Sequence, residues 1–191
     1  MKTPPVELPI ITSDGIFLAH YSENGLAELE FPKLSHRRRR GDESLISVRS
    51  LKIDGDSSCR HLQPKIRAWH RITADGLKTI LAGGEPKVFP PLDLAGTDFQ
   101  KSVWNALRKI SLGKTKSYGE IAAAIGRPKA IRAVGGACGA NPVPVLVPCH
   151  RVLAANKKLG GFSGGLDWKR TLLAREGIIL RSSANTENAE V

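Results

Sequence analysis

Two residues whose side chains can do chemistry together, Cys149 and His150, stand side by side in the chain. They follow the apolar stretch at residues 142–148, PVPVLVP, which predicts a strand whose prolines stiffen the approach to the cysteine. A thiol attacks as its thiolate, and a neighbouring histidine can take the proton directly or through one water. The pair therefore marks Cys149 as a candidate nucleophile. Taken alone, it favours the alternative, a buried cysteine at a strand end beside an exposed histidine.

The cysteines indicate free thiols. There are three, Cys59, Cys138 and Cys149, and none forms a CxxC pair, so we expect no disulfide framework and a reducing compartment. Cys138 is interpreted as a small packing residue. Cys59, His61 and His70 fit no standard zinc spacing, and no metal is expected.

The elements that must position Cys149 differ between the two halves of the chain. In the N-terminal half, short or alternating apolar runs predict strands at residues 15–19, 26–31, 45–48 and 51–53. Residues 66–81 are ambiguous, with an apolar spacing that suggests a helix. Residues 86–91 break the periodicity and are interpreted as a linker.

The C-terminal half has helical patterning from Thr97 onward. Thr97 with Gln100 is a predicted capping box in front of an amphipathic helix. Ser117 with Glu120 is a second capping box, and the helix that it opens is stopped by Gly126.

A third short helix is predicted to open at Pro128, because proline suits the first helical turn. Together with the helix before it, this gives the outline of a helix-turn-helix. A last helix is predicted at residues 167–175, with Gly177 as its C-terminal cap. Residues 182–191 are interpreted as a disordered polar tail.

The charge of the chain suggests a polyanionic partner for its C-terminal half. The net charge is +11; residues 1–92 hold 14 Lys and Arg against 11 Asp and Glu, whereas residues 93–191 hold 15 against 7. Four of the N-terminal positives form the run Arg37 to Arg40, for which a solvated turn is favoured over a nuclear address or a phosphate-contacting loop. No apolar stretch approaches the roughly 20 residues that span a bilayer, and the N-terminus does not resemble a secretory signal.

Several long segments resemble one family. Residues 127–152 read RPKAIRAVGGACGANPVPVLVPCHRV and are followed by GGFSGG at residues 160–165. Together with LAGTDFQ, SYGEIA and REG, they closely resemble the O6-alkylguanine-DNA alkyltransferases, also called methylated-DNA–protein-cysteine methyltransferases. The resemblance covers roughly Pro91 to Gly177.

The resemblance implies an α/β (α+β) protein of two domains. The expected N-terminal domain, residues 1–90, is strand-rich, ribonuclease H-like and structural. The expected C-terminal domain, residues 91–181, is mostly helical and winged-helix-like, contains the helix-turn-helix, and carries both the alkyltransferase site and the DNA-binding surface.

The resemblance also assigns catalytic roles. Cys149 is the expected alkyl acceptor. His150 is expected to act on it through a water, oriented by Glu176 near the end of the last helix, in a relay that parallels hydrolytic triads. Asn141 is expected to brace the turn that presents the cysteine.

The base and the DNA have expected contacts of their own. The carbonyls of Cys149 and Val152 are expected to accept from the guanine 2-amino group, and Tyr118 and the Ser163 backbone to donate to the base. An expected DNA-binding set comprises Arg132, Tyr118, Ala133, Gly135, Gly136 and Arg151. In it, Arg132 fills the gap left by an extruded base and the small residues let the helix approach the minor groove.

The implied activity is DNA repair by direct reversal. An alkyl group passes once and irreversibly from O6-alkylguanine in duplex DNA, with O4-alkylthymine as a further possible substrate, to Cys149. The resemblance implies a monomer with no cofactor and no membrane association, cytoplasmic in a prokaryote or nuclear in a eukaryote. Lys169 matches a family position near the rim of the pocket, but an exposed helical lysine is the favoured interpretation. Phe162, where relatives often have tyrosine, and Gly139, where some have arginine, depart from the family pattern.

Two other functions are alternatives for a sequence of this pattern. A non-catalytic damage-recognition protein on the same scaffold would replace the cysteine, typically with tryptophan, so Cys149 argues against it. A helix-turn-helix regulator that uses alkylation as a signal would carry an additional cysteine-rich zinc domain, which this sequence lacks.

Overall fold

The computed structural model describes residues 5–32 and 63–180 of the 191-residue chain. Its elements, in chain order, are β1 (Val6–Thr12), β2 (Gly15–Tyr21), β3 (Leu26–Glu30), α1 (Pro64–Leu81), α2 (Asp98–Leu107), β4 (Lys116–Ser117), α3 (Tyr118–Ala124), α4 (Ile131–Gly139), the 3-10 helix η1 (Cys149–Arg151), β5 (Val152–Leu153), the 3-10 helix η2 (Ala155–Lys157) and α5 (Leu166–Arg175). This mixture confirms the α+β class. The ribonuclease H-like and winged-helix details and the domain bounds stay predictions.

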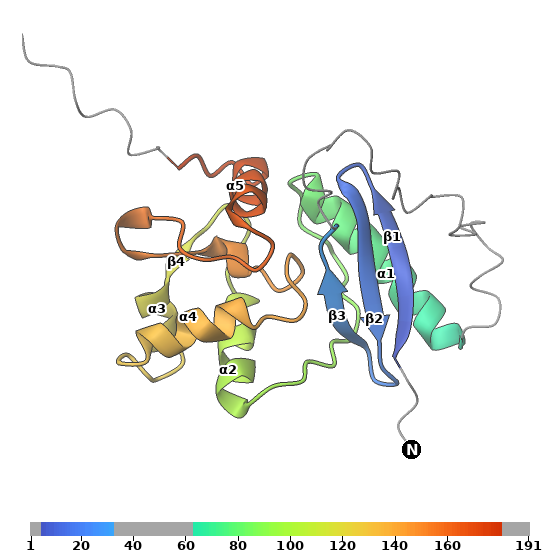
Figure 1. Ribbon diagram of the computed structural model, residues 1–191, viewed down its shortest axis with the longest axis horizontal. Helices are drawn as coiled ribbons and strands as arrows, with labels where there is room; N and C mark the ends of the chain where they lie inside the picture. Colours follow the sequence, from blue (N-terminus) through green and yellow to red (C-terminus); the bar gives the residue numbers. More distant parts are fainter. Residues whose placement is uncertain (1–4, 33–62, 181–191) are drawn as a thin grey trace, which may run out of the picture.

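An antiparallel sheet in the order β1-β2-β3 forms the N-terminal part, with α1 lying along it (Figure 1). Alternation along β2 buries Phe17, Ala19 and Tyr21, as expected for a strand with one face on the core. Sequence patterning predicted β2 and β3 but missed β1, whose Pro9 interrupts the strand signal. β1 pairs with β2 alone in the described sheet, and an edge strand tolerates proline. The strands predicted at residues 45–53 lie outside the described residues.

Helices α2, α3 and α4 pack against one another in the C-terminal part. Both predicted capping boxes are confirmed. Thr97 Oγ1 accepts from the Gln100 amide at 3.2 Å and Ser117 Oγ accepts from the Glu120 amide at 3.1 Å, while each N3 side chain accepts from the amide of its cap residue. The predicted last helix is also confirmed as α5, and Gly177 follows it with a φ of 78°.

Two predictions about backbone conformation are wrong. The third helix begins at Ile131 rather than at Pro128, because residues 127–130 form a turn in which the Ala130 amide donates to the Arg127 carbonyl. Residues 142–148 are not a strand. They form a tight turn in which the Val147 amide donates to the Val143 carbonyl, since prolines in this segment cannot donate to a strand ladder.

The N-terminal sheet is attached to the C-terminal part by backbone and aromatic contacts. The Leu29 amide of β3 donates to the Pro142 carbonyl at 2.9 Å. Phe31 packs against Trp168 of α5 and against Phe162, with ring centroids 5.1 and 5.6 Å away. The sheet therefore touches both loops that flank Cys149.

No helix within the described residues is long and apolar enough to cross a membrane.

Trp104 is the largest fully buried side chain and links α2 to α4, because its indole Nε1 donates to the Ala137 carbonyl at 2.8 Å. Trp104→Phe leaves a void and an unpaired carbonyl, so we expect the free energy of unfolding to fall by about 2–3 kcal/mol in urea denaturation. The half-buried Trp69 of α1 provides the control. Trp69→Phe should cost under about 1 kcal/mol; equal losses from the two variants would contradict this role of Trp104.

Candidate active site

Cys149 opens the 3-10 helix η1, and its side chain is held from one side by Asn141. Asn141 Nδ2 donates to Cys149 Sγ at 3.1 Å and to the Val147 carbonyl at 2.8 Å, while Asn141 Oδ1 accepts from the Val143 amide at 3.1 Å. These three bonds tie both ends of the turn at residues 142–148 to the thiol. The bracing role expected of Asn141 is consistent with this geometry.

Burial dominates the electrostatics of the thiol. Cys149 is 4 % exposed, and this burial raises the pKa of its thiol, because a low-dielectric surrounding disfavours the thiolate. The hydrogen bond from Asn141 and the positive charge of Lys169 act in the opposite direction. Burial therefore favours the protonated thiol, whereas Asn141 and Lys169 favour the thiolate that forms when a base accepts the proton.

His150, the residue after Cys149, is buried in a pair with Glu176. Its Nε2 lies 2.9 Å from Glu176 Oε1, and both side chains are essentially inaccessible to solvent. Burial lowers the pKa of His150, and Glu176 opposes this shift. Because an ionised carboxylate only accepts, Nε2 carries the proton in the neutral ring and Nδ1 is left as a base. Nδ1 is buried and has no hydrogen-bond partner among the described residues, so it is available to take a proton.

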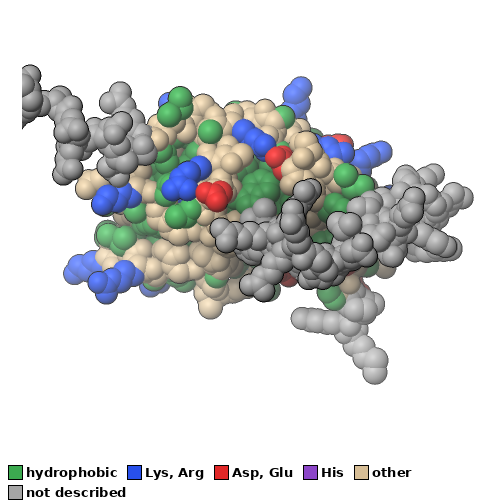
Figure 2. All heavy atoms as spheres, turned by 45° about the horizontal axis from the view of Figure 1, so that its top comes forward, with side chains coloured by type: hydrophobic (Ala, Val, Ile, Leu, Met, Phe, Trp, Pro, Cys, Tyr) green, Lys and Arg blue, Asp and Glu red, His purple; other side chains and the backbone are tan. Residues whose placement is uncertain are grey.

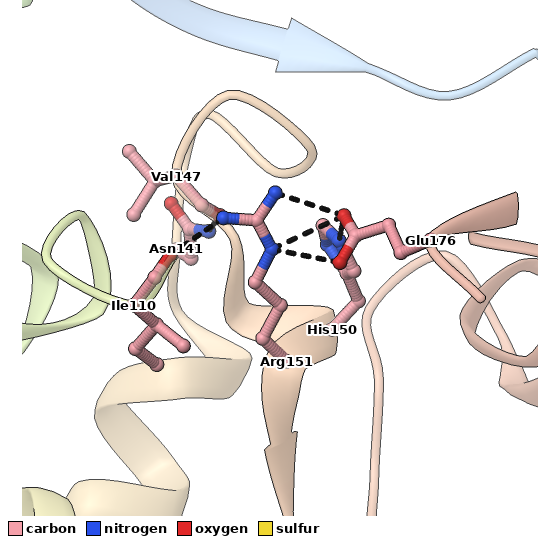
Figure 3. A network of polar contacts seen from close by, with 6 residues as sticks. All are labelled: Ile110, Asn141, Val147, His150, Arg151 and Glu176. Carbon is pink, nitrogen blue, oxygen red and sulfur yellow. Dashed lines mark hydrogen bonds and ion pairs between the residues drawn. The ribbon is translucent and has the colours of Figure 1, made fainter. Parts of the chain in front are cut away.

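Arg151 was expected to contact DNA, but its side chain is buried and its donors are bound within the chain. It is 6 % exposed, its Nε and Nη2 donate to the Glu176 carboxylate at 2.9–3.1 Å, and its Nη1 donates to the Ile110 carbonyl at 2.6 Å (Figure 3). Burial works to raise the pKa of Glu176, but the bonds from His150 and Arg151 outweigh it and hold the pKa below its usual value. Arg151 thus keeps Glu176 ionised for His150.

Lys169 is also misplaced by sequence reasoning, which took it for an exposed residue. It is fully buried on α5, and its Nζ donates to the Val152 carbonyl at 2.7 Å and lies 3.4 Å from the Gly161 carbonyl. Burial lowers its pKa to about 8, and negative charge on Cys149 and Cys138 opposes that shift. The helical spacing of Lys169, Leu172, Leu173 and Glu176 along one buried face was the signal that could have placed it correctly.

A groove of about 570 Å³ opens between α3, α4 and the loop before α5, and we call it the Tyr118 groove. It is lined by Tyr118, Ile131, Arg132, Gly135, Gly139, Gly161, Phe162 and Ser163. Cys149 does not line it. Burial raises the pKa of the Tyr118 phenol, and negative charge on Cys138 and Cys149 adds to this, so the phenol and the two thiols influence one another's ionisation.

The groove brings together residues that the sequence placed on separate segments. Tyr118 comes from the first turn of α3, Arg132 from the first turn of α4, and Ser163 from the loop before α5. Gly160 has a φ of 64°, and a Cβ there would lie 2.9 Å from the Tyr118 hydroxyl, so glycine is required for this loop to close on the tyrosine. Among the small residues expected to face DNA, Ala133 and Gly136 are exposed and Gly135 lines the groove.

Comparison with known proteins identifies the family to which the chain belongs. A family model described as 6-O-methylguanine DNA methyltransferase, DNA binding domain, matches residues 98–178. A relative from Mycobacterium tuberculosis, named methylated-DNA–protein-cysteine methyltransferase, is 46 % identical over 132 residues, which cover 69 % of this chain and 79 % of the relative. The chain belongs to this methyltransferase family.

Solved structures of methyltransferases show the same fold. The structure of Mycobacterium tuberculosis OGT in complex with DNA has a TM-score of 0.65 at 36 % identity, covering 88 % of this chain and 90 % of that one. An O6-methylguanine DNA methyltransferase from Methanococcus jannaschii has a TM-score of 0.58 at 28 % identity, covering 95 % and 100 %.

The described part of the chain offers no metal site. No group of three or more His, Cys, Asp or Glu side chains is placed there to hold an ion. Cys59 and His61 lie outside the described residues, and His70 lies 3.2 Å from the Tyr21 hydroxyl through its Nδ1.

The charge of Lys169 should affect the pKa of the Cys149 thiol. Lys169→Met removes a buried cation that favours the Cys149 thiolate, so the pKa of the thiol should rise and the pH profile of its alkylation by iodoacetamide should move to higher pH. Arg170→Met is the matched control, because Arg170 is exposed on the same helix. An unchanged profile in a folded Lys169→Met variant would show that the lysine charge does not reach the thiol.

Proposed function

We propose that this chain repairs DNA by taking an alkyl group from O6-alkylguanine in a duplex onto Cys149, once per molecule. The observation that carries the proposal is a buried thiol, held by Asn141, next to a buried His150–Glu176 pair whose free Nδ1 can act as a base. Membership of the methyltransferase family and the likeness to a relative solved with DNA support duplex DNA as the partner.

Transfer begins with loss of the thiol proton to His150 Nδ1, through one water, while Glu176 stabilises the resulting imidazolium. The thiolate sulfur then attacks the alkyl carbon. An S–C bond forms as the C–O6 bond breaks, and guanine leaves with the electron pair of the broken bond. Tyr118 and the Ser163 amide at the groove stabilise the charge that develops on the base. The product is a thioether, and no step restores the thiolate.

The base must leave the duplex to reach the thiol. Cys149 is 4 % exposed, so a base stacked in a duplex cannot reach its sulfur, and we propose that the nucleotide is extruded into the Tyr118 groove, which costs about a few kcal/mol in pairing and stacking. Arg132 is exposed in the first turn of α4 and borders the groove, so it is placed to fill the gap in the stack. In this proposal the Val152 carbonyl still accepts from the guanine 2-amino group, although it already accepts a hydrogen bond from Lys169 Nζ.

Positive charge around the helix pair suits a phosphate backbone. Exposed basic side chains follow α3 or lie in α4 and near η2, namely Arg127, Lys129, Arg132, Lys157 and Lys158. On the face drawn in Figure 2, which is turned toward α5, Lys and Arg side chains lie along the left-hand edge of the C-terminal part. Binding to such a surface is sequence-independent and weakens with salt. We propose that the protein acts as a monomer and needs no cofactor.

The transfer is tested by mass spectrometry. After incubation with a duplex containing O6-methylguanine, the peptide that holds Cys149 should carry one methyl group in place of the thiol proton, in proportion to the base repaired. Cys149→Ala should abolish transfer and leave duplex affinity nearly unchanged. Repaired DNA beside an unmodified peptide would contradict the proposal, and binding without repair would point to the damage-recognition alternative.

The role of Arg132 is tested by comparing two substrates. Arg132→Ala should slow transfer from a duplex by about 10²-fold, because no side chain then fills the gap that the extruded base leaves in the stack. Transfer from free O6-alkylguanine, which needs no extrusion, should change little. Arg127→Ala is the matched control, since an exposed phosphate contact weakens affinity and is compensated by raising the duplex concentration. Equal losses on both substrates would mean that Arg132 does not serve extrusion.

A further inference from the structure

The end of α5 is bound to the first hairpin of the chain. Asp14, in the turn between β1 and β2, accepts two hydrogen bonds from Arg175, at 2.6 Å from Nη2 to Oδ1 and 2.9 Å from Nη1 to Oδ2. The two residues are 161 positions apart. Arg175 is the last residue of α5, and Glu176, the carboxylate that orients His150, comes directly after it.

This contact differs from an ordinary surface ion pair, which contributes little to stability. The guanidinium and the carboxylate meet in a two-point arrangement, and the side chains are only 30 % and 19 % exposed. The hydrogen bond from Arg175 holds the pKa of Asp14 below its usual value, although burial opposes this. Asp14 is itself fixed, because its amide donates to Thr12 Oγ1 at 3.2 Å and Thr12 Oγ1 donates to the Gly15 carbonyl at 2.8 Å.

The backbone of the same residue lies close to the end of α1. Gly83, just after α1, has a φ of 81°, and a Cβ there would lie 2.3 Å from the Arg175 carbonyl oxygen. The N-terminal part thus binds the Arg175 side chain through the hairpin and lies close against the Arg175 backbone at Gly83.

The last turn of a helix frays unless something anchors it. The arrangement after Arg175 is a tight one, in which the Gly177 amide donates to the Ala174 carbonyl and the Ile178 amide donates to the Leu173 carbonyl. The Glu176 carboxylate leaves from within this turn to meet His150 and Arg151. A shift of the turn would move this carboxylate away from His150 Nε2.

We propose that Asp14 is a positioning residue for alkyl transfer, which acts by anchoring Arg175 and so fixing the Glu176 carboxylate against His150. The role rests on the proposed function. It assigns to the N-terminal hairpin, far from the Tyr118 groove in the sequence, a direct part in the alignment of the relay. DNA affinity does not depend on it.

The experiment uses the full chain and three substitutions. Asp14→Asn removes the charge and keeps the shape, and Arg175→Lys keeps the charge and removes the two-point contact. Asp167→Asn is the matched control, because Asp167 pairs with Arg170 on the exposed side of the same helix, at 3.1 Å. Each variant is assayed below its melting temperature for transfer from duplex and from free O6-alkylguanine, for duplex affinity, and for the ¹⁵N chemical shift of His150 Nε2.

Asp14→Asn and Arg175→Lys should each slow transfer about tenfold on both substrates, with duplex affinity unchanged. The combination should be no slower than either alone, since both break one interaction. The His150 Nε2 signal should move in both variants, and Asp167→Asn should change nothing.

A lower melting temperature with transfer within twofold of wild type and an unmoved His150 signal would overturn the proposal and leave Asp14 a structural residue only. Additive losses would overturn it as well. A wild-type chain that does not transfer would overturn the proposed function, whereas the His150 signal would still show whether Asp14 positions the Glu176–His150 pair.

Discussion

The buried carboxylate of Glu176 is the interaction on which the site depends. An ionised group taken out of water is costly unless it is paired and hydrogen-bonded, and Glu176 accepts from His150 and from two nitrogens of Arg151. Arg151 in turn donates to Ile110 just beyond α2. Three segments that are distant in sequence, the residues after α2, the turn after Cys149 and the end of α5, therefore meet at one charge cluster. Movement of the turn after Cys149 or of the end of α5 would leave a buried charge unpaired, and movement of Ile110 would remove an acceptor from Arg151.

The two buried cations of the site have different tasks. Arg151 is fully engaged with Glu176 and Ile110, so its charge is neutralised locally. Lys169 donates only to neutral carbonyls, and its pKa falls to about 8, so its charge is poorly compensated unless the nearby Cys149 becomes a thiolate. In the proposed reaction the thiolate and Lys169 stabilise each other before transfer. The thioether then formed is neutral and leaves Lys169 without that partner.

Sequence reasoning succeeded where the determining contacts are local. The capping boxes at Thr97 and Ser117 involve residues three positions apart, so their sequence signature and their geometry coincide. The adjacency of Cys149 and His150 likewise needs no long-range information. The turn at residues 142–148 was misread because apolar residues between prolines resemble a strand, whereas its conformation is set by Asn141, which binds the turn and the thiol at once.

Sequence reasoning did not foresee that the side chains of Arg151 and Lys169 are buried, and both failures have a common physical origin. Charged residues are rarely buried, so each was assigned to a surface, Arg151 to DNA and Lys169 to solvent. Each is buried because it has a partner elsewhere in the chain: Arg151 donates to Glu176, and Lys169 donates to the Val152 carbonyl. Such partners follow from the packing of α5 on the rest of the C-terminal part, and that packing includes Phe31 of the N-terminal part against Trp168. The catalytic chemistry is therefore encoded in one half of the chain, while the position of its side chains depends on both.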